Sequence, residues 1–205
     1  MSSLKGLNNT MKRTSFLTKL KKEKKIQVVE PSEEIKVAYL QRSEESLRSA
    51  KALFQINNLK DSVALTYYSM YYSLLALLFR IGIKCENHTG AIMLLKEIFD
   101  IDNEKIAAAK KERVDKQYYV DFSVTKEEVS DMIIIAEEFN SQLLHFIDTL
   151  NQNKIKKYQE KVTKIEQELK LQPFNGKPLG YKFFREKKLN GKRLLFLVYE
   201  QHKCV

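Results

Sequence analysis

The sequence predicts a mainly α protein: an antiparallel helical bundle of four to five helices, followed by a helix and a β-hairpin. Apolar residues recur at separations of three and four over most of residues 31–150, which is the spacing of one face of a helix. No Pro or Gly interrupts residues 61–81, and this stretch is apolar around most of its circumference, as in a helix at the centre of a domain. Asn190-Gly191 lies between two apolar stretches and is the strongest short signal for a hairpin turn.

The first helix of the bundle is expected to begin just after Pro31. Residues 1–30 are a polar, Lys-rich arm in which a short helix around residues 15–25 fits the pattern. Ser32 is a suitable cap, because its hydroxyl can accept a hydrogen bond from an N–H of the first helical turn. The apolar stripe that follows continues to about Ile56, so we expect an amphipathic helix over that range.

The central buried helix is expected to run from Asp61, as its cap, to Gly82, since Gly adopts the left-handed conformation that ends many helices. About sixteen consecutive residues in it carry no formal charge, so a membrane span is the alternative. Four Tyr, three Ser and one Thr dilute the stretch, whereas a span needs about twenty predominantly apolar residues. We therefore expect a core helix and no membrane.

Three further helices are expected in the bundle. After a loop at residues 83–87, they cover residues 89–99, residues 103 to about 116, and residues 125–150. The last of them begins with Thr125-Lys-Glu-Glu128, a capping box in which the first and last side chains each bond the backbone N–H of the other residue. Residues 118–124 are expected to be extended or irregular.

The composition changes beyond residue 150. Asn153–Leu171 predicts a thin, Lys-rich helix, and Pro173 and Pro178 stop helical structure after it. Tyr181–Leu189 and Lys192–Glu200 are expected to be the two strands of the hairpin. Because two strands alone are only marginally stable in water, this appendage requires a packing partner.

The formal charge of +10 is concentrated at the two ends of the chain. Residues 1–25 carry eight Lys or Arg against one Glu, and residues 151–205 carry fourteen against five acidic residues. Basic ends suit RNA or another polyanion through release of counterions, and a Lys-rich tail that is merely solvated is the alternative. We therefore divide the chain into an arm (1–30), a bundle (31–150) and an appendage (151–205).

The cysteines and histidines indicate neither a disulfide framework nor a metal site. Cys85 and Cys204 lie far apart in the sequence, which fits a reducing cytoplasm. No cluster of His, Cys and carboxylates has the spacing of metal ligands, and no apolar signal-peptide core follows the N-terminus. We expect a cytoplasmic protein without metal or cofactor.

Three stretches resemble the HEPN domain family: SEESLRSAKAL (43–53), ALTYYSMYYSLLALLFRIGIKCENHTGAIMLL (64–95) and KKERVDKQYYVDF (110–122). The similarity extends over roughly residues 11–150. It implies an all-helical, often dimeric domain that binds RNA or nucleotide. Many members of this family are ribonuclease toxins that are paired with a small nucleotidyltransferase. Their active site is similar to Arg-x(4–6)-His and is assembled across the dimer.

Metal-free cleavage of RNA explains why such an enzyme uses Arg and His. The 2′-hydroxyl must lose its proton, the charge on the pentacoordinate phosphorus must be stabilised, and the leaving oxygen must gain a proton. A His with a pKa near neutrality, beside a fixed Arg, can share these tasks. The resemblance therefore directs attention to pairs of Arg and His in this sequence.

Arg80 and His88 form the first candidate catalytic pair. They are separated by seven residues, with the helix end at Gly82 between them, so they depart from the spacing of the family. Each also has a structural alternative. Arg80 can complement the dipole of its helix and pair with Glu86 or another acid, and His88 can cap the next helix or satisfy a buried backbone group.

Arg113 and Tyr118 form the second candidate pair. They have the position and spacing of the family motif, with Tyr in the place of His. A Tyr can hydrogen-bond to a phosphate, but its pKa near 10 makes it a poor base at pH 7. Asp115 and Tyr119 are expected to line the same RNA or nucleotide site. The structural alternative is a polar contact among Arg113, Asp115 and Tyr118.

The appendage has a resemblance of its own. Together with the Lys-rich helix before it, the stretch PFNGKPLGYKFFREKKLNGKRLLFLVYEQHKCV (173–205) resembles the second half of a RelE/ParE-type toxin. The first strand and helix of that fold are absent. The resemblance implies that Arg185 and Arg193 occupy sheet positions that touch RNA, and the alternative is a fused remnant that retains only its basic charge.

Two functional hypotheses follow. The first is a HEPN-domain protein of toxin–antitoxin type that binds RNA or nucleotide as a homodimer and acts as a metal-independent endoribonuclease. The second is a non-catalytic interaction module whose partner is a small nucleotidyltransferase.

Overall fold

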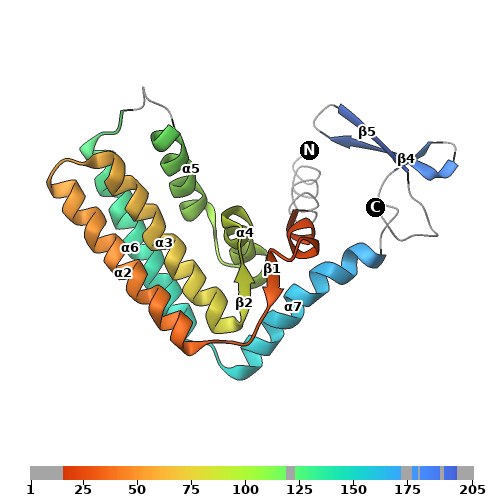
Figure 1. Ribbon diagram of the computed structural model, residues 1–205, viewed down its shortest axis with the longest axis horizontal. Helices are drawn as coiled ribbons and strands as arrows, with labels where there is room; N and C mark the ends of the chain where they lie inside the picture. Colours follow the sequence, from red (N-terminus) through yellow and green to blue (C-terminus); the bar gives the residue numbers. More distant parts are fainter. Residues whose placement is uncertain (1–15, 119–122, 172–176, 180, 190–191, 198–205) are drawn as a thin grey trace. The chain divides into compact units, whose positions relative to one another are not determined.

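The structure is a computed structural model that describes residues 16–118, 123–171, 177–179, 181–189 and 192–197 (Figure 1). It is mainly helical, as the sequence predicts. The chain forms two compact units, Met1–Thr163 and Lys164–Val205. The first unit contains the helical bundle and the candidate site.

The first bundle helix, α2 (Glu33–Gln55), begins where the sequence predicts. The Ser32 hydroxyl accepts a hydrogen bond from the backbone N–H of Ile35 at 3.2 Å, so Ser32 is the cap. Two serines then let α2 approach the next helix closely: the Ser43 hydroxyl donates to the carbonyl of Ser69 and contacts the Ser73 hydroxyl, both at 2.8 Å. Small hydrogen-bonded side chains at this crossing leave no buried polar atom unpaired there.

Helix α3 (Leu59–Ile81) is the buried centre of the unit. Its cap position is Asn58, three residues before the predicted cap Asp61, and Asp61 accepts a hydrogen bond from the Asn58 side chain at 2.8 Å within the first turn. It ends at Gly82 as predicted, with a φ of 79° in the left-handed region. Helices α2, α4, α5 and α6 all contact it.

Helix α3 is also the one helix of the described residues long and apolar enough to cross a membrane, and 72% of its most apolar window is buried inside the protein. The core helix of a bundle has the same length and composition, and this degree of burial is what such a position produces.

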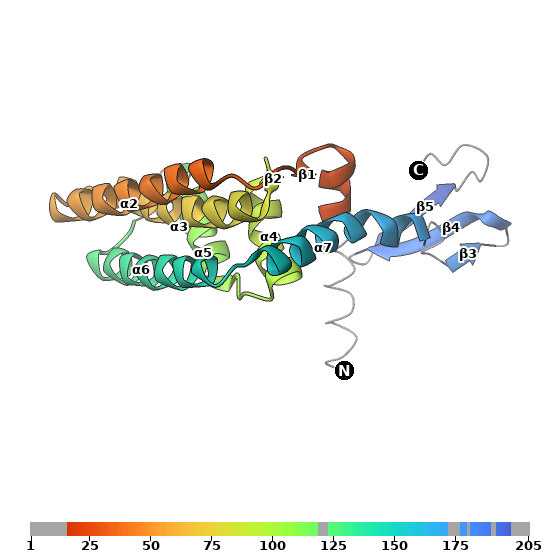
Figure 2. The same cartoon turned by 90° about the horizontal axis from the view of Figure 1, so that it is seen from below.

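Helix α6 (Lys126–Asp148) confirms the predicted capping box. The Thr125 hydroxyl accepts from the N–H of Glu128 at 3.2 Å, and the Glu128 carboxylate accepts from the N–H of Thr125 at 2.9 Å. The helix packs against α3 through a small apolar cluster of Val63, Val129 and Ile133. Figure 2 shows α2 and α3 as one layer with α6 on one side of it.

A two-stranded sheet occupies segments that we expected to be arm and loop. Strand β1 (Ile26–Val28) pairs antiparallel with β2 (Ile83–Cys85), so the expectation of a plain loop at residues 83–87 was wrong. Gly82 is required at this junction for a second reason: a Cβ on it would lie 2.2 Å from the carbonyl oxygen of Val29. The sheet holds the chain close as it turns from α3 into α4.

Helices α4 (His88–Phe99) and α5 (Glu104–Tyr118) complete the surroundings of α3. Asn87 caps α4, because its side-chain oxygen accepts from the N–H of Gly90 at 2.8 Å. His88 therefore does not cap α4 but is its first residue. Helix α5 extends to Tyr118, where an irregular segment was expected to begin, and residues 119–122 lie outside the described part of the chain.

Helix α7 (Gln152–Leu171) begins in the first unit. Its buried residues Ile155 and Val162 face the bundle. The Gln159 side chain donates to the carbonyl of Ile81 at 2.8 Å, and the Lys161 ammonium donates to the carbonyl of Ile98 at 2.9 Å. These bonds occupy carbonyls in the last turns of α3 and α4, which have no partner within their own helices.

The second unit contains a three-stranded antiparallel sheet in the order β3-β4-β5. Strands β4 (Tyr181–Leu189) and β5 (Lys192–Leu197) are the predicted hairpin, and Leu189 pairs with Lys192 next to its turn. Strand β3 (Lys177–Leu179) adds a third strand that the sequence analysis did not predict.

Candidate functional site

His88, at the first position of α4, is held by two tyrosines of α3. Its Nδ1 lies 2.7 Å from the Tyr67 hydroxyl, a hydrogen-bonding distance. Its ring stacks on the ring of Tyr71, with centroids 3.8 Å apart and planes inclined by 11°. Tyr67 and Tyr71 are one helical turn apart and both buried, so a rigid part of the core fixes the position of the imidazole.

Arg113 of α5 reaches the same tyrosines. Its guanidinium carbon lies 5.7 Å from the ring centroid of Tyr67 and 4.9 Å from that of Tyr68, both within the range of a cation–π contact. Its Nε is buried and has no hydrogen-bond partner within the described residues. Tyr67 thus contacts His88 through its hydroxyl and Arg113 through its ring, although these two residues lie 25 positions apart in the sequence.

Lys110 adds a second cation one turn earlier on α5. Its ammonium hydrogen-bonds to the hydroxyl of Thr89, which follows His88 in α4. Burial and the neighbouring Arg113 lower the pKa of Lys110. No carboxylate forms an ion pair with Lys110 or Arg113 in the described part of the chain.

These surroundings favour the neutral form of His88. Burial lowers the pKa of His88, and the positive charges of Arg113 and Lys110 lower it further. Burial raises the pKa of Tyr67 and of Tyr71, so both remain phenols at neutral pH. A neutral imidazole next to two cations can accept a proton once an anion offsets their charge. We call His88, Arg113, Lys110, Tyr67 and Tyr71 the Arg–His cluster.

The structure does not bring Arg80 and His88 together within one chain. Arg80 lies in the last turn of α3, nine residues or about 13 Å along the helix from Tyr71. Its Nη2 lies 3.5 Å from the carbonyl oxygen of Leu150, and its Nε lies 3.9 Å from a carboxylate oxygen of Glu33. The ion-pair alternative for Arg80 therefore holds with Glu33 in the place of Glu86.

The other predicted site residues are placed only by their backbone. Asp115 and Tyr118 lie on α5, within two turns of Arg113, and Tyr119 is outside the described residues. Arg185 on β4 pairs with Phe196 on β5, and Arg193 on β5 pairs with Lys188. Both arginines thus lie on strands of the sheet in the second unit.

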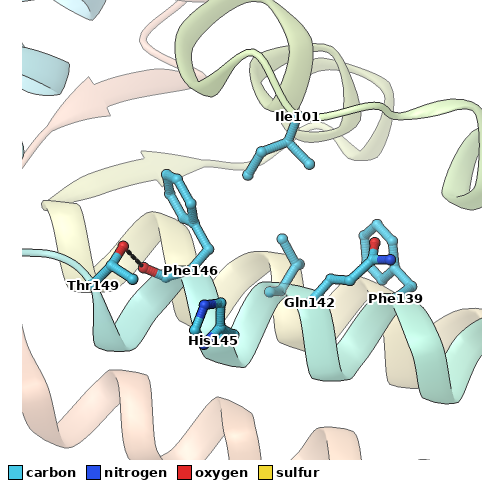
Figure 3. Close-up of a pocket in the computed structure, with 7 residues that line it drawn as sticks. Ile101, Phe139, Gln142, His145, Phe146 and Thr149 are labelled. Atoms are coloured by element: carbon cyan, nitrogen blue, oxygen red, sulfur yellow. Dashed lines mark hydrogen bonds between the residues drawn. The ribbon is translucent and has the colours of Figure 1, made fainter.

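A separate pocket lies along α6 and contains none of the residues of the Arg–His cluster (Figure 3). Its lining residues are Ile101, Phe139, Gln142, Leu143, His145, Phe146 and Thr149. Most of the lining is apolar, and the Thr149 hydroxyl is bonded to the carbonyl of Phe146 at 2.8 Å. This composition suits an apolar group better than a phosphate, so we place the candidate site at the Arg–His cluster.

Metal ligands do not gather in the described residues, where no group of three or more His, Cys, Asp and Glu could hold an ion. From the sequence, Arg113 and His88 were assigned to two separate candidate pairs, and Tyr67 and Tyr71 were counted only among the four Tyr of the central helix. Lys110 was not singled out. The one signal in the sequence was the position of Arg113 and Lys110 on the same face of one helix, three residues apart.

Comparison with known families gives one match. A model of the HEPN domain family matches residues 37–145, which is more than half of the chain. The matched region runs from the second turn of α2 to the last turn of α6 and includes every residue of the Arg–His cluster. A search of curated proteins finds no match. The chain belongs to the HEPN domain family.

Proposed function

We propose that the protein binds RNA or a nucleotide at the Arg–His cluster and acts there as a metal-independent endoribonuclease. The observation that carries the proposal is the meeting of Arg113 and His88 on Tyr67. An Arg and a His in one place are the groups that this chemistry needs, and here they come from two helices rather than from one motif.

Four residues of the cluster have a role in the proposed reaction. Arg113 and Lys110 bind the phosphate, and Arg113 stabilises the charge that develops on its oxygens. His88 takes the proton of the 2′-hydroxyl, whose oxygen attacks the phosphorus as the bond to the 5′-oxygen breaks. The products are a 2′,3′-cyclic phosphate and a 5′-hydroxyl. Tyr67 orients the imidazole and contributes no proton of its own.

Residues beyond Arg113 on α5 extend the proposed site. Tyr118 lies five residues after Arg113, more than one helical turn further along α5. We assign Tyr118 as the donor of the proton that the leaving 5′-oxygen takes up. Asp115 and Tyr119 help to hold the nucleotide. Arg185 and Arg193, on the sheet of the second unit, are proposed to contact RNA phosphates separately from this site.

The biological setting we propose is a cytoplasmic toxin–antitoxin system in which the chain acts as a homodimer. A specific observation favours a second function: Tyr118 stands where the family motif has His. In that case the chain is a non-catalytic interaction module, and its partner is a small nucleotidyltransferase. Co-purification of the two proteins in a fixed ratio, without any cleavage of RNA, would support this second function.

Cleavage of a labelled transfer-RNA pool in EDTA tests the first proposal. The wild type is compared with Arg113→Ala and His88→Ala, and Arg80→Ala is the matched control because its side chain lies outside the cluster. We expect cuts from the wild type and from Arg80→Ala, and a loss of about 100-fold or more in the other two variants. Folded wild-type protein that makes no cuts would favour the interaction module instead.

A further inference from the structure

Four half-buried aromatic rings follow one another from the Arg–His cluster along the α2–α3 pair, and we call them the aromatic ladder: Tyr68, Tyr72, Tyr39 and Phe79. The ring centroids of Tyr68 and Tyr72 are 6.0 Å apart, and those of Tyr72 and Tyr39 are also 6.0 Å apart. Phe79 lies 5.5 Å from Tyr39. Adjacent rings are inclined by only 20–23°. The ladder extends about 16 Å along α3.

The ladder is on the side of α3 that is turned away from α6. Val63 packs against Val129 and Ile133 of α6. Tyr72 is nine residues after Val63, which places it about half a turn away around the helix at 100° per residue. In Figure 2, α6 lies on one side of the α2–α3 layer, consistent with this assignment. The rings are therefore part of a surface of the first unit, not of its core.

Two arginines lie over the rings. The guanidinium carbon of Arg113 is 4.9 Å from the ring centroid of Tyr68, and that of Arg42 is 5.3 Å from the ring centroid of Tyr72. Neither arginine forms an ion pair within the described part of the chain. At the Phe79 end the next cation, Arg80, is near Glu33. The unneutralised positive charge thus lies at the end of the ladder next to His88.

Unpaired arginines beside aromatic rings are the surface that binds single-stranded nucleic acid, since bases stack on the rings and phosphates meet the cations. A duplex does not fit, because its bases are already stacked inside the helix. A second copy of this chain fits poorly as well. A two-fold contact centred on the ladder would bring Arg42 and Arg113 of each copy near their equivalents, and neither has an ion pair in the described residues of its own chain.

We propose that the aromatic ladder binds a single strand of RNA, with about one base on each ring, and leads it to the Arg–His cluster. This inference rests on the proposed function and shares Arg113 with the Arg–His cluster. Tyr39, Tyr72, Phe79 and Arg42 have no part in the proposed chemistry. They add affinity for a longer strand.

The test compares binding of two ligands, a dinucleotide and an octauridylate, both 2′-O-methylated so that they cannot be cut. The chain has no Trp, so its intrinsic emission comes mainly from its ten tyrosines, and a change in this emission reports binding. The variants are Tyr72→Leu and Arg42→Gln. Arg48→Gln is the matched control, because Arg48 is an exposed arginine of the same helix that has no ring beneath it in the described residues.

We expect Tyr72→Leu to weaken binding of the octauridylate about tenfold and to leave binding of the dinucleotide unchanged. Arg42→Gln should weaken binding of the octauridylate several-fold, and Arg48→Gln should bind it as tightly as the wild type does. If the wild type does not bind the dinucleotide but Tyr72→Leu still weakens binding of the octauridylate, the proposed function is refuted and the proposed role of the aromatic ladder is not.

Three results would overturn the proposal that the aromatic ladder binds RNA. The first is a folded Tyr72→Leu or Arg42→Gln protein that binds the octauridylate as well as the wild type. The second is a wild type that does not bind the octauridylate at all. The third is a sedimentation measurement in which Arg42→Glu turns a dimer into a monomer, because the ladder would then be the contact between copies.

Discussion

Tyr67→Phe removes the one atom that links α3 to His88 by a hydrogen bond and keeps the ring beneath Arg113. The Tyr67 side chain is fully buried, and its hydroxyl lies 2.7 Å from His88 Nδ1. The change leaves a half-buried ring nitrogen without its partner, which costs about 1–2 kcal/mol of unfolding free energy. For a chain of this size, each kcal/mol lowers Tm by about 2–4 °C. We therefore expect Tm to fall by about 2–8 °C.

Thermal unfolding followed by circular dichroism measures this effect, and Tyr68→Phe is the control. Tyr68 also lies beneath Arg113, but its hydroxyl forms no hydrogen bond within the described residues. The control should remain within about 0.5 kcal/mol of the wild type. In a His88→Ala background, Tyr67→Phe should lower the free energy of unfolding by less, because the hydrogen-bond partner of the Tyr67 hydroxyl is already absent. An unchanged Tm for Tyr67→Phe, or equal losses in both variants, would refute the hydrogen bond on which the site is built.

Three further predictions concern His88, the α3–α4 junction and RNA. Because burial and nearby cations lower the pKa of His88 in the folded protein, the unfolded chain binds this proton more readily; stability should fall as the pH drops below about 6.5, and His88→Gln should reduce that fall in denaturant titrations. Gly82→Ala should lower Tm by several degrees, since the new Cβ would lie 2.2 Å from the carbonyl oxygen of Val29 at a φ of 79°, and a Tm equal to that of the wild type would contradict the turn described. If about six terminal Lys or Arg contact RNA phosphates, affinity should fall about a thousandfold between 50 and 200 mM salt, and a flat response would exclude those ends from binding.

Local signals in the sequence predicted the helices well. Ser32 and the Thr125–Glu128 box mark two helix starts, because each cap bond joins residues only three apart. Gly82 marks a helix end, because its N–H bonds to carbonyls only three and four residues earlier in the chain. The cap of α3 was misplaced by three residues, since Asn58 and Asp61 are both residue types that commonly cap helices.

Features that depend on distant contacts were not predictable. Strands β1 and β2 contain three residues each and pair across more than fifty positions of sequence, so neither has a local pattern of its own. The candidate site has the same character. His88 and Arg113 were recognised by chemistry and by resemblance, but their meeting depends on Tyr67, whose place at a helical spacing is also that of an ordinary core residue.

The central claim is that Arg113 and His88 belong to one site, and a proton NMR titration of the His88 ring tests it without any ligand. The chain has three histidines, and His88→Gln identifies the signal of His88. Removing the positive charge in Arg113→Gln should raise the pKa of His88, because that charge disfavours the imidazolium, while Arg80→Gln should leave the pKa unchanged. A pKa of His88 that does not respond to Arg113→Gln, or that responds to Arg80→Gln instead, would contradict the claim.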